Sequence, residues 1–497
     1  MSFSNAALPE LVLSLLRSFS HHHSSIAVQS SIPSANLCFA ELVTMYKGPA
    51  ASVVAMLVIL LLVQTAGLWL SSHSALRDGM PLPTPHQPSS MSASQLSMTG
   101  NTLDWVYKPE AHADDPALTP SQCDAAFPKL WYEIDRSIAF RKEKLAQRIT
   151  TNDTSLYWRR DGAFRALIHN NQLRILETKG IFSLKNSQYP ERTIAVWQQI
   201  HRALLGAAAA GEKLPSIEFA ATVDDIPGDI GSNDLDTRTL WAFCRKYSDR
   251  SHDRLFLMPD FNHWSWHGVA GPLNEMQAYS KIRNESMESK IPKAAWRGAT
   301  WTNPRIREPL IKATSQQPWA DVANFDWSTR HGFISMEDFC LFAFLIHTEG
   351  RSWSGRLKYL LGCESVTLIH DLDWTTHYYH LLVAEGPGQN FVSVKDDFSN
   401  LREKVMYFLE NIEEAQRIAD NAVETFRDRY LTLGAETCYW RKLIKGWSTV
   451  ADSPQVYETV HFNISGFSGT KEKLRGIAFE ELVVSRATRE WPPEPSK

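Results

Sequence analysis

The segment IPKAAWRGATWTNPRIREPLIKATSQQPWADVANFDW, residues 291–327, decides the fold class. Its apolar beginning predicts a strand followed by a loop, REPLIKATSQQ has apolar residues at helical spacing, and ADVANFDW predicts a second strand. A strand, a helix and a strand within so short a stretch are typical of a parallel βαβ unit. The sequence therefore predicts an α/β protein with a largely parallel sheet.

The alternation continues along the chain. MEDFCLFAFLIHTEG and RLKYLLGC predict helices, SVTLIH predicts a buried strand, and LREKVMYFLENIEEAQRIADNAVETFRDRY predicts one long amphipathic helix over residues 401–430. Towards the amino terminus, LPSIEFAATVDDIPGD predicts a buried strand from Ile217 to Val223 that is closed by Asp224, Asp225 and Pro227. Polar groups at the ends of such strands often belong to active sites.

Composition limits the classes of function. The chain has 497 residues, 43% of them hydrophobic, which is enough for a large core and predicts two or three domains. A formal net charge of -4 excludes a whole-chain basic surface for nucleic acid, so any anion site must be local. The 17 tryptophans suit core packing and also stacking on sugar rings.

One segment has the length and composition of a membrane span. Residues 49–70, PAASVVAMLVILLLVQTAGLWL, carry no charge and predict an uncleaved transmembrane anchor rather than a removed signal peptide. Residues 1–48 then form a cytosolic tail, with the hypothesis that translation begins at Met45, and the Ser- and Pro-rich residues 71–102 form a stem.

The remainder of the chain is expected in a secretory lumen. The triplets that begin at Asn152, Asn284 and Asn463 match the N-glycosylation pattern, which also arises by chance. These observations predict a single-pass type II protein of the Golgi or endoplasmic reticulum membrane.

Two segments suggest an anion site. In GRSWSGRLKYLLGC, Ser354 lies near the expected start of a helix, where free N–H groups attract anions, with Ser352 ahead of it and Arg356 on the first turn. Arg297 follows the expected strand in WRGATW, beside the small Gly298. Two guanidinium groups would suit a diphosphate without a divalent ion. The alternatives are a serine cap beside a surface arginine and a structural salt bridge.

Five motifs occur in the order of a known family: LPSIEFAATVDDIP, WRGATWTNPRIREPLI, GRSWSGRLKYLLGC, NFVSVKDDFSNL and CYW. Over about residues 123–445 the chain resembles the family-90 glycosyltransferases, which include the capsule-associated proteins and the protein O-glucosyltransferases. The capsule-associated branch, which transfers xylose, is the more similar, since the cysteine-rich acceptor-binding region of the protein O-glucosyltransferases is missing from the amino-terminal third.

The resemblance implies a GT-B architecture, with two Rossmann-like lobes and a cleft between them. The amino-terminal acceptor lobe would span residues 103–285, the UDP-sugar lobe residues 286–445, and an extension residues 446–497. It also implies a UDP-sugar donor, inversion at the anomeric carbon, and no metal or other cofactor.

The resemblance implies residue roles as well. Asp225 would be the catalytic base, and Trp264 and Trp266 would stack on sugars unless they pack in the core. Disulfides would join Cys340 to Cys363 and Cys123 to Cys438, leaving Cys244 unpaired. The UDP-sugar contacts would be Arg297, Ser352, Ser354, Gly355 and Arg356.

The expected function is transfer of xylose or glucose from a UDP-sugar to a hydroxyl of a glycan or glycoprotein. Alternatives are a protein O-glucosyl- or O-xylosyltransferase, a membrane-tethered glycan-binding protein without turnover, and a metal-dependent enzyme using the D-x-D pair Asp371 and Asp373. His377 and His380 lack an accompanying acidic partner, so a surface or core role is the default for them.

Overall fold

The computed structural model describes residues 105–487, except 160, 183–187, 229, 231–235, 267–268, 284, 327–328 and 330–331. The expected tail, span and stem (residues 1–48, 49–70 and 71–102) and the glycosylation position Asn284 lie outside the described residues. Within the part that the structure describes, no helix is long and apolar enough to cross a membrane.

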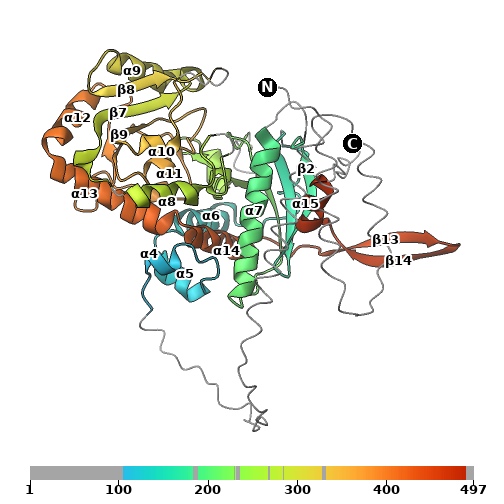
Figure 1. Ribbon diagram of the computed structural model, residues 1–497. Helices are drawn as coiled ribbons and strands as arrows, with labels where there is room; N and C mark the ends of the chain where they lie inside the picture. Colours follow the sequence, from blue (N-terminus) through green and yellow to red (C-terminus); the bar gives the residue numbers. More distant parts are fainter. Residues whose placement is uncertain are drawn as a thin grey trace, which may run out of the picture. The chain divides into compact units, whose positions relative to one another are not determined.

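The carboxyl-terminal lobe is built on a parallel sheet with the strand order β12-β10-β9-β7-β8. Helix α9 (Pro304–Thr314) connects β7 (Ile291–Gly298) to β8 (Ala320–Asn324), so the βαβ unit predicted over residues 291–327 is confirmed (Figure 1). The other strands are β9 (Phe342–His347), β10 (Val366–Ile369) and β12 (Val392–Ser393).

Two helix predictions in this lobe are wrong. The segment 336–350 forms a single short turn, α10 (Met336–Phe339), and then the strand β9, whose six residues are all buried between β7 and β10. A strand buried on both faces is a continuous apolar run, which periodicity cannot distinguish from a buried helix. The helix expected over 401–430 breaks at Asn411, which leaves helical geometry and donates its side-chain amide to the Tyr407 carbonyl.

The amino-terminal lobe contains a mixed sheet with the order β15-β2-β1-β3-β4-β6. Strand β1 (Ala163–His169) pairs antiparallel with β2 (Gln172–Lys179) and β3 (Ile217–Thr222), whereas β3, β4 (Trp241–Ala242) and β6 (Phe256–Leu257) are parallel. Only part of this lobe therefore has the predicted Rossmann-like pairing. Asn170 and Asn171, both with positive φ, make the two-residue turn that returns β2 alongside β1.

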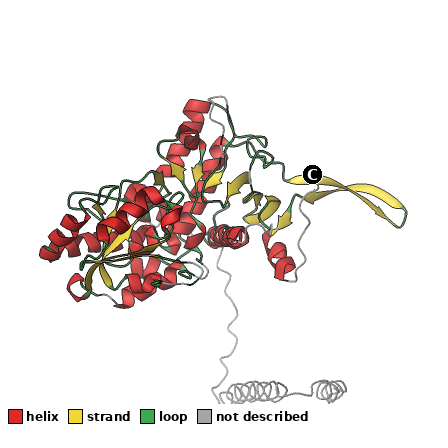
Figure 2. Cartoon of the chain, turned by 90° about the horizontal axis from the view of Figure 1, so that it is seen from above, coloured by secondary structure: helices red, strands yellow, loops and turns green. Residues whose placement is uncertain are grey.

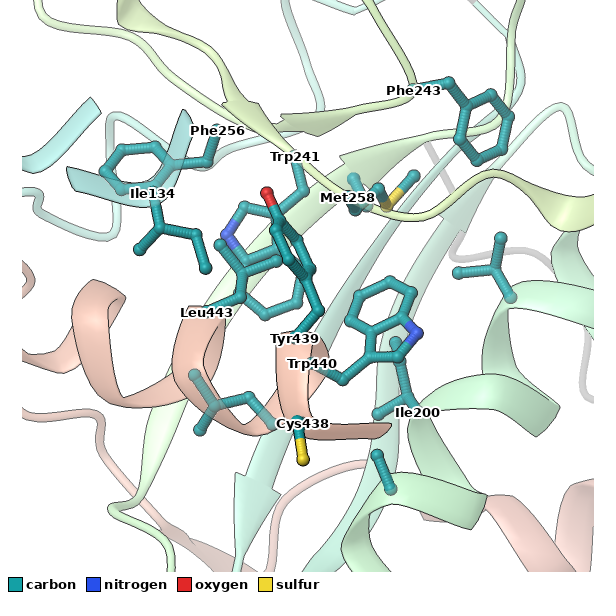
Figure 3. Packing of buried hydrophobic residues seen from close by; sticks show 14 of the residues in the cluster. Ile134, Ile200, Trp241, Phe243, Phe256, Met258, Cys438, Tyr439, Trp440 and Leu443 are labelled. Atoms are coloured by element: carbon teal, nitrogen blue, oxygen red, sulfur yellow. The ribbon is translucent and has the colours of Figure 1, made fainter. Parts of the chain in front are cut away.

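The carboxyl-terminal segment returns to this lobe. Helix α14 (Leu433–Val450) runs across the boundary expected at residue 445, and Figure 3 shows its Tyr439 and Trp440 packed beside Trp241 of β4. Strand β15 (Ile477–Ala478) joins the sheet at β2. The amino-terminal lobe is thus assembled from both ends of the described chain.

The cysteine pairing is as expected. Disulfides join Cys123 to Cys438 and Cys340 to Cys363, and Cys244 is free and buried. The first links α5 (Pro120–Ala126) to α14, and the second links the end of α10 to the residues after α11 (Leu357–Leu360).

The remaining elements complete both lobes (Figure 2). They are α4 (Pro109–His112), α6 (Tyr132–Phe140), α7 (Gln188–Ala209), β5 (Arg245–Lys246), α8 (Leu273–Arg283), β11 (Trp374–Thr375), α12 (Leu401–Glu410), α13 (Ile412–Ala422), the π-helical segments Arg141–Leu145 and Val423–Tyr430, the hairpin strands β13 (Tyr457–Ile464) and β14 (Phe467–Leu474), α15 (Phe479–Ala487), and the short 3₁₀ turns Arg250–Arg254, Phe261–His263, Met287–Ser289, Thr300–Thr302 and Tyr379–Leu381.

Candidate active site

A cavity of about 860 Å³ is lined by residues of both lobes. The amino-terminal lobe contributes α7, Asp225 beyond β3 and the residues around the turn Phe261–His263. The carboxyl-terminal lobe contributes the end of β7, the following turn, Arg307 of α9 and the loop before α11. The lining residues that matter below are Arg192, Asp225, Asn262, Trp264, Trp266, Trp301, Arg307, Ser354, Gly355 and Arg356.

Asp225 lies just beyond β3, at the cavity wall, with its side chain 34% exposed. Arg192 of α7 donates to Asp225 Oδ1 at 2.8 Å, and its guanidinium also stacks on the Phe261 ring at 4.7 Å. Among the described residues, no hydrogen bond reaches Asp225 Oδ2. One carboxylate oxygen is therefore fixed and the other is available to a ligand in the cavity.

The backbone of Asp225 is held from the opposite lobe. The Ser352 hydroxyl donates to the Asp225 carbonyl oxygen at 2.7 Å, and the Cys244 thiol approaches the same oxygen at 3.3 Å. Burial raises the pKa of Cys244, so the thiol keeps its proton. Ser352 was expected to contact a diphosphate; here it is buried and positions Asp225.

The neighbouring Asp224 is not a cavity residue. The Tyr189 hydroxyl donates to Asp224 Oδ2 at 3.1 Å, and burial, followed by the nearby Asp224 carboxylate, raises the pKa of Tyr189 to about 12. Of the two adjacent carboxylates, only that of Asp225 therefore lines the cavity.

Three guanidinium groups at the cavity lack a carboxylate partner among the described residues: those of Arg307, Arg351 and Arg356, of which Arg351 is exposed to solvent. Arg307 of α9 is buried and donates to the carbonyl oxygens of Glu349 (3.0 Å) and Ala299 (2.8 Å). Arg356 donates to the carbonyl of Arg297, and its Nε has no partner among the described residues.

Burial lowers the pKa of the guanidinium groups of Arg307 and Arg356. Burial and then Arg356 lower the pKa of Arg307 to about 9, and burial and then Arg297 lower the pKa of Arg356 to about 10. Because desolvated cations without a counter-ion are unfavourable, this wall of the cavity favours an anionic ligand.

Arg297 does not line the cavity. Its guanidinium forms an ion pair with Asp321 of β8 at 2.6 Å and donates to the carbonyl oxygens of Gly332 and Asp321. Its positive charge helps to lower the pKa of Arg356, but its N–H groups donate to residues of its own lobe. The buried guanidinium that lines the cavity beside Arg356 is instead that of Arg307. The sequence interpretation missed it, although the helical spacing of Ile306 and Leu310 places it on a half-buried face.

The loop before α11 packs tightly against the amino-terminal lobe. A Cβ on Gly355 would stand 1.9 Å from Asn262 Nδ2, so the buried Asn262 side chain would have to move to admit one, while Ser354 and Arg356 on either side face the cavity. Helix α11 has four residues, shorter than predicted, so the positive charge at this site comes mainly from side chains rather than from a helix end.

A buried ion pair lies behind this loop. Lys358 Nζ donates to both carboxylate oxygens of Asp260, at 2.6 and 2.7 Å, and both side chains are almost fully inaccessible. Although burial alone would raise it, Lys358 and His263 hold the pKa of Asp260 well below its usual value. Trp353 donates to the same carboxylate at 3.3 Å. No sequence pattern indicates this contact between the lobes, because Asp260 and Lys358 are 98 positions apart.

The aromatic residues of the cavity differ in availability. The Trp264 ring is covered by the Arg202 guanidinium at 4.7 Å, and Trp266 packs edge-on against Phe261, with ring centroids 6.4 Å apart. Trp301, which the sequence interpretation did not single out, lines the same cavity with 70% of its surface exposed.

The other sequence candidates lie elsewhere. Asp373 forms an ion pair with Arg305 at 3.1 Å, Asp371 is exposed, and neither lines the cavity. His377 is buried against His263 and Tyr439, and His380 bonds the Lys129 carbonyl. Asn152 and Asn463 are exposed.

Among known proteins, the chain is similar to protein O-glucosyltransferases. Protein O-glucosyltransferase 2 of Danio rerio is 25% identical over 245 residues, covering 48% of this chain and 48% of that protein. Protein O-glucosyltransferase 1 of Homo sapiens is 27% identical over 173 residues, covering 32% of this chain and 43% of that protein. The chain thus spans about half the length of these relatives.

One solved structure, "Crystal structure of GtfA/B complex", covers 33% of this chain and 38% of that chain at 11% identity, with a TM-score of 0.24 too low to support a statement about fold. The family model described as glycosyl transferase family 90 matches residues 148–464, which include the carboxyl-terminal lobe, most of the amino-terminal lobe and every cavity residue discussed above. The chain belongs to glycosyl transferase family 90.

Proposed function

We propose that this chain is an inverting, metal-independent glycosyltransferase that transfers a sugar from a UDP-sugar to a hydroxyl group of a glycoprotein. The observation that carries the proposal is that one cavity between two lobes is lined by the Asp225 carboxylate and by the guanidinium groups of Arg307 and Arg356, which have no carboxylate partner among the described residues. A base on one side and a cationic wall on the other are what displacement of a diphosphate requires.

In the proposed mechanism, Asp225 Oδ2 accepts the proton of the acceptor hydroxyl while that oxygen attacks the anomeric carbon. The bond to the β-phosphate oxygen breaks, and UDP leaves with the bonding electron pair. Arg192 and Ser352 keep the carboxylate in place. Arg307 and Arg356 stabilise the charge that develops on the leaving diphosphate, the part that a divalent ion plays in other glycosyltransferases.

The acceptor and the donor sugar are proposed from different observations. The relatives are named as protein O-glucosyltransferases, which favours a protein hydroxyl and glucose. The motif resemblance favours xylose and a glycan, so both donors and both acceptors belong in the test. We further propose a type II Golgi or endoplasmic reticulum membrane protein, because two disulfides suit an oxidising lumen. Glycan at Asn152 or Asn463, removed by peptide N-glycosidase with a fall in mass, would follow from that location.

The test measures UDP release by the full chain from UDP-glucose, UDP-xylose and other UDP-sugars, with and without EDTA and with protein and glycan acceptors. We expect transfer from one of the two named donors, unaffected by EDTA. The Asp225→Asn variant is expected to lose at least about 10²-fold in kcat, the scale of general-base catalysis, with unchanged affinity for UDP.

Retained activity in the Asp225→Asn variant would remove the proposed base. UDP binding without turnover on any donor would favour the glycan-binding alternative, and activity abolished by EDTA would favour a metal-dependent enzyme.

A further inference from the structure

A β-hairpin near the carboxyl terminus projects from the rest of the described chain (Figures 1 and 2). Strands β13 (Tyr457–Ile464) and β14 (Phe467–Leu474) form a separate two-stranded sheet in regular antiparallel register, closed by Ser465 and Gly466 with positive φ. At its base the Tyr457 ring meets His169 edge-on. An isolated two-stranded sheet is only marginally stable in water, so the stability of a projecting hairpin requires an explanation.

The two faces of this hairpin differ in chemistry. The two residues of each directly opposite pair point to the same face of the hairpin, and every second pair shares that face. One face therefore carries the pairs Ile464–Phe467, Phe462–Gly469 and Val460–Lys471. We name the four side chains Val460, Phe462, Ile464 and Phe467 the apolar hairpin face. Ile464 is 65% and Phe467 79% exposed.

The opposite face is polar towards the turn. Asn463 pairs with Ser468, His461 with Thr470, and Thr459 with Glu472, whose carboxylate accepts the Thr459 hydroxyl at 2.7 Å. The glycosylation pattern at Asn463 therefore lies on the face away from Ile464 and Phe467. A glycan there would leave the apolar hairpin face uncovered.

We propose that the apolar hairpin face lies on the surface of a lipid bilayer and gives the chain a membrane contact separate from the expected span at residues 49–70. The apolar residues gather at the free end, and Lys471 and Lys473 follow further back on the same side, where Glu458 is paired with Lys473 at the base. Aliphatic and aromatic side chains enter the boundary of the acyl region, while ammonium groups reach the lipid phosphates. The apolar segment 49–70 would hold this hairpin near a bilayer.

A second copy of the chain is the less suitable occupant. A stable protein interface needs about 800 Å² from each partner. The two phenylalanines offer at most about 500 Å² together, and Val460 and Phe462 are already partly covered, so the apolar hairpin face does not reach this area. A bilayer requires no matching protein surface, and the polar face with Asn463 would remain in water.

The test uses the full chain reconstituted into phosphatidylcholine vesicles, with one nitroxide label attached to Ile464→Cys or, as matched control, to Ser468→Cys on the opposite face. Cys38→Ser removes a competing thiol, and Cys244 is buried. Collision of each label with oxygen, which enters lipid, and with a water-soluble nickel chelate is measured by electron paramagnetic resonance.

We expect the label at residue 464 to collide at least about three times less with the nickel chelate than the label at residue 468, and more with oxygen. Adding Phe462→Ser and Phe467→Ser should abolish this difference. Equal chelate collision at both positions would overturn the proposal, as would protection of residue 464 from both reagents with spin–spin broadening, which indicates a second copy. Flotation shows that the chain is bound to the vesicles at all, and a chain that does not float overturns both the hairpin contact and the expected span at residues 49–70.

Discussion

At the scale of single residues, the cavity contains three arginines without a described carboxylate partner, the exposed Arg351 and the more enclosed Arg307 and Arg356. Arg307 and Arg356 are held by carbonyl oxygens, whereas Arg297 is paired with Asp321. The sequence shows many arginines, but only the partners that surround each one in three dimensions decide which remains available to a ligand.

Arg307→Met should weaken UDP binding by about 1.5–3 kcal/mol, roughly 10- to 150-fold, because a hydrogen bond to a charged group is lost. Arg305→Met is the matched control, since its side chain lies two positions earlier on α9, is 58% exposed and pairs with Asp373 and Asp396. Calorimetric titration with UDP measures both affinities. Equal affinities for the two variants would show that Arg307 does not bind the diphosphate.

The Glu349 carboxyl predicts a pH dependence of stability. Burial, partly offset by the N–H groups of Trp374 and Asp373, raises the pKa of Glu349 from 4.5 to about 7. Below pH 4.5 the folded and unfolded chains are both protonated at this group, so it costs no stability. Between pH 4.5 and 7 only the unfolded chain releases the proton, so the free energy of unfolding falls, by up to about 3 kcal/mol.

Glu349→Gln should remove this fall in the free energy of unfolding, because an amide does not titrate. The amide oxygen still accepts the Trp374 N–H, which bonds the carboxylate at 2.8 Å. Urea unfolding at pH 4.5 and pH 8 measures the change, with the exposed Glu385→Gln as control for the other titrating groups. A variant that loses as much stability as the control between these pH values would contradict the assignment.

At the scale of elements, the loop from residue 350 to residue 356 is shaped by the lobe opposite it. Ser352 bonds the Asp225 carbonyl, and Gly355 lies against Asn262. The motif could be recognised in the sequence, together with Asp225 and Arg356. The use of Ser352 could not, because a hydroxyl binds whichever acceptor the folded chain brings to it, here one 127 residues away.

Gly355→Ala should disturb this loop, because its Cβ would stand 1.9 Å from Asn262 Nδ2 and Asn262 is buried. We expect a loss of about 1–3 kcal/mol in stability and a fall of about tenfold in UDP affinity as Arg356 shifts. Gly388→Ala is the control, since nothing lies within 4 Å of its added Cβ. Thermal unfolding and UDP titration indistinguishable from that control would mean that the loop tolerates the methyl group.

At the scale of the whole molecule, the buried Asp260–Lys358 pair joins the two lobes behind the cavity. Lys358→Met would leave a carboxylate buried without a cation, which typically costs about 3–5 kcal/mol. The exposed Lys395→Met serves as control, and urea unfolding measures the difference. Addition of Asp260→Asn to the Lys358 variant should restore part of the loss. A Lys358 variant as stable as the control would show that the pair does not stabilise the junction.

The sequence by itself determined the local features of this protein: the βαβ unit at residues 291–327, the strand that ends shortly before Asp225, and the ordered motifs of the family. Apolar periodicity and turn residues depend on a few neighbouring positions, so both can be recognised in the sequence. It also gave, through the resemblance, both disulfide pairs.

Only the tertiary structure decided which charges meet. It paired Arg192 with Asp225 and Arg297 with Asp321, left Arg307 and Arg356 facing the cavity, and placed α14 in the amino-terminal lobe. It also turned the apolar run at residues 342–347 into a central strand. These outcomes depend on contacts between distant segments, whose energies are set by burial and by the partners available, and neither is visible along the chain.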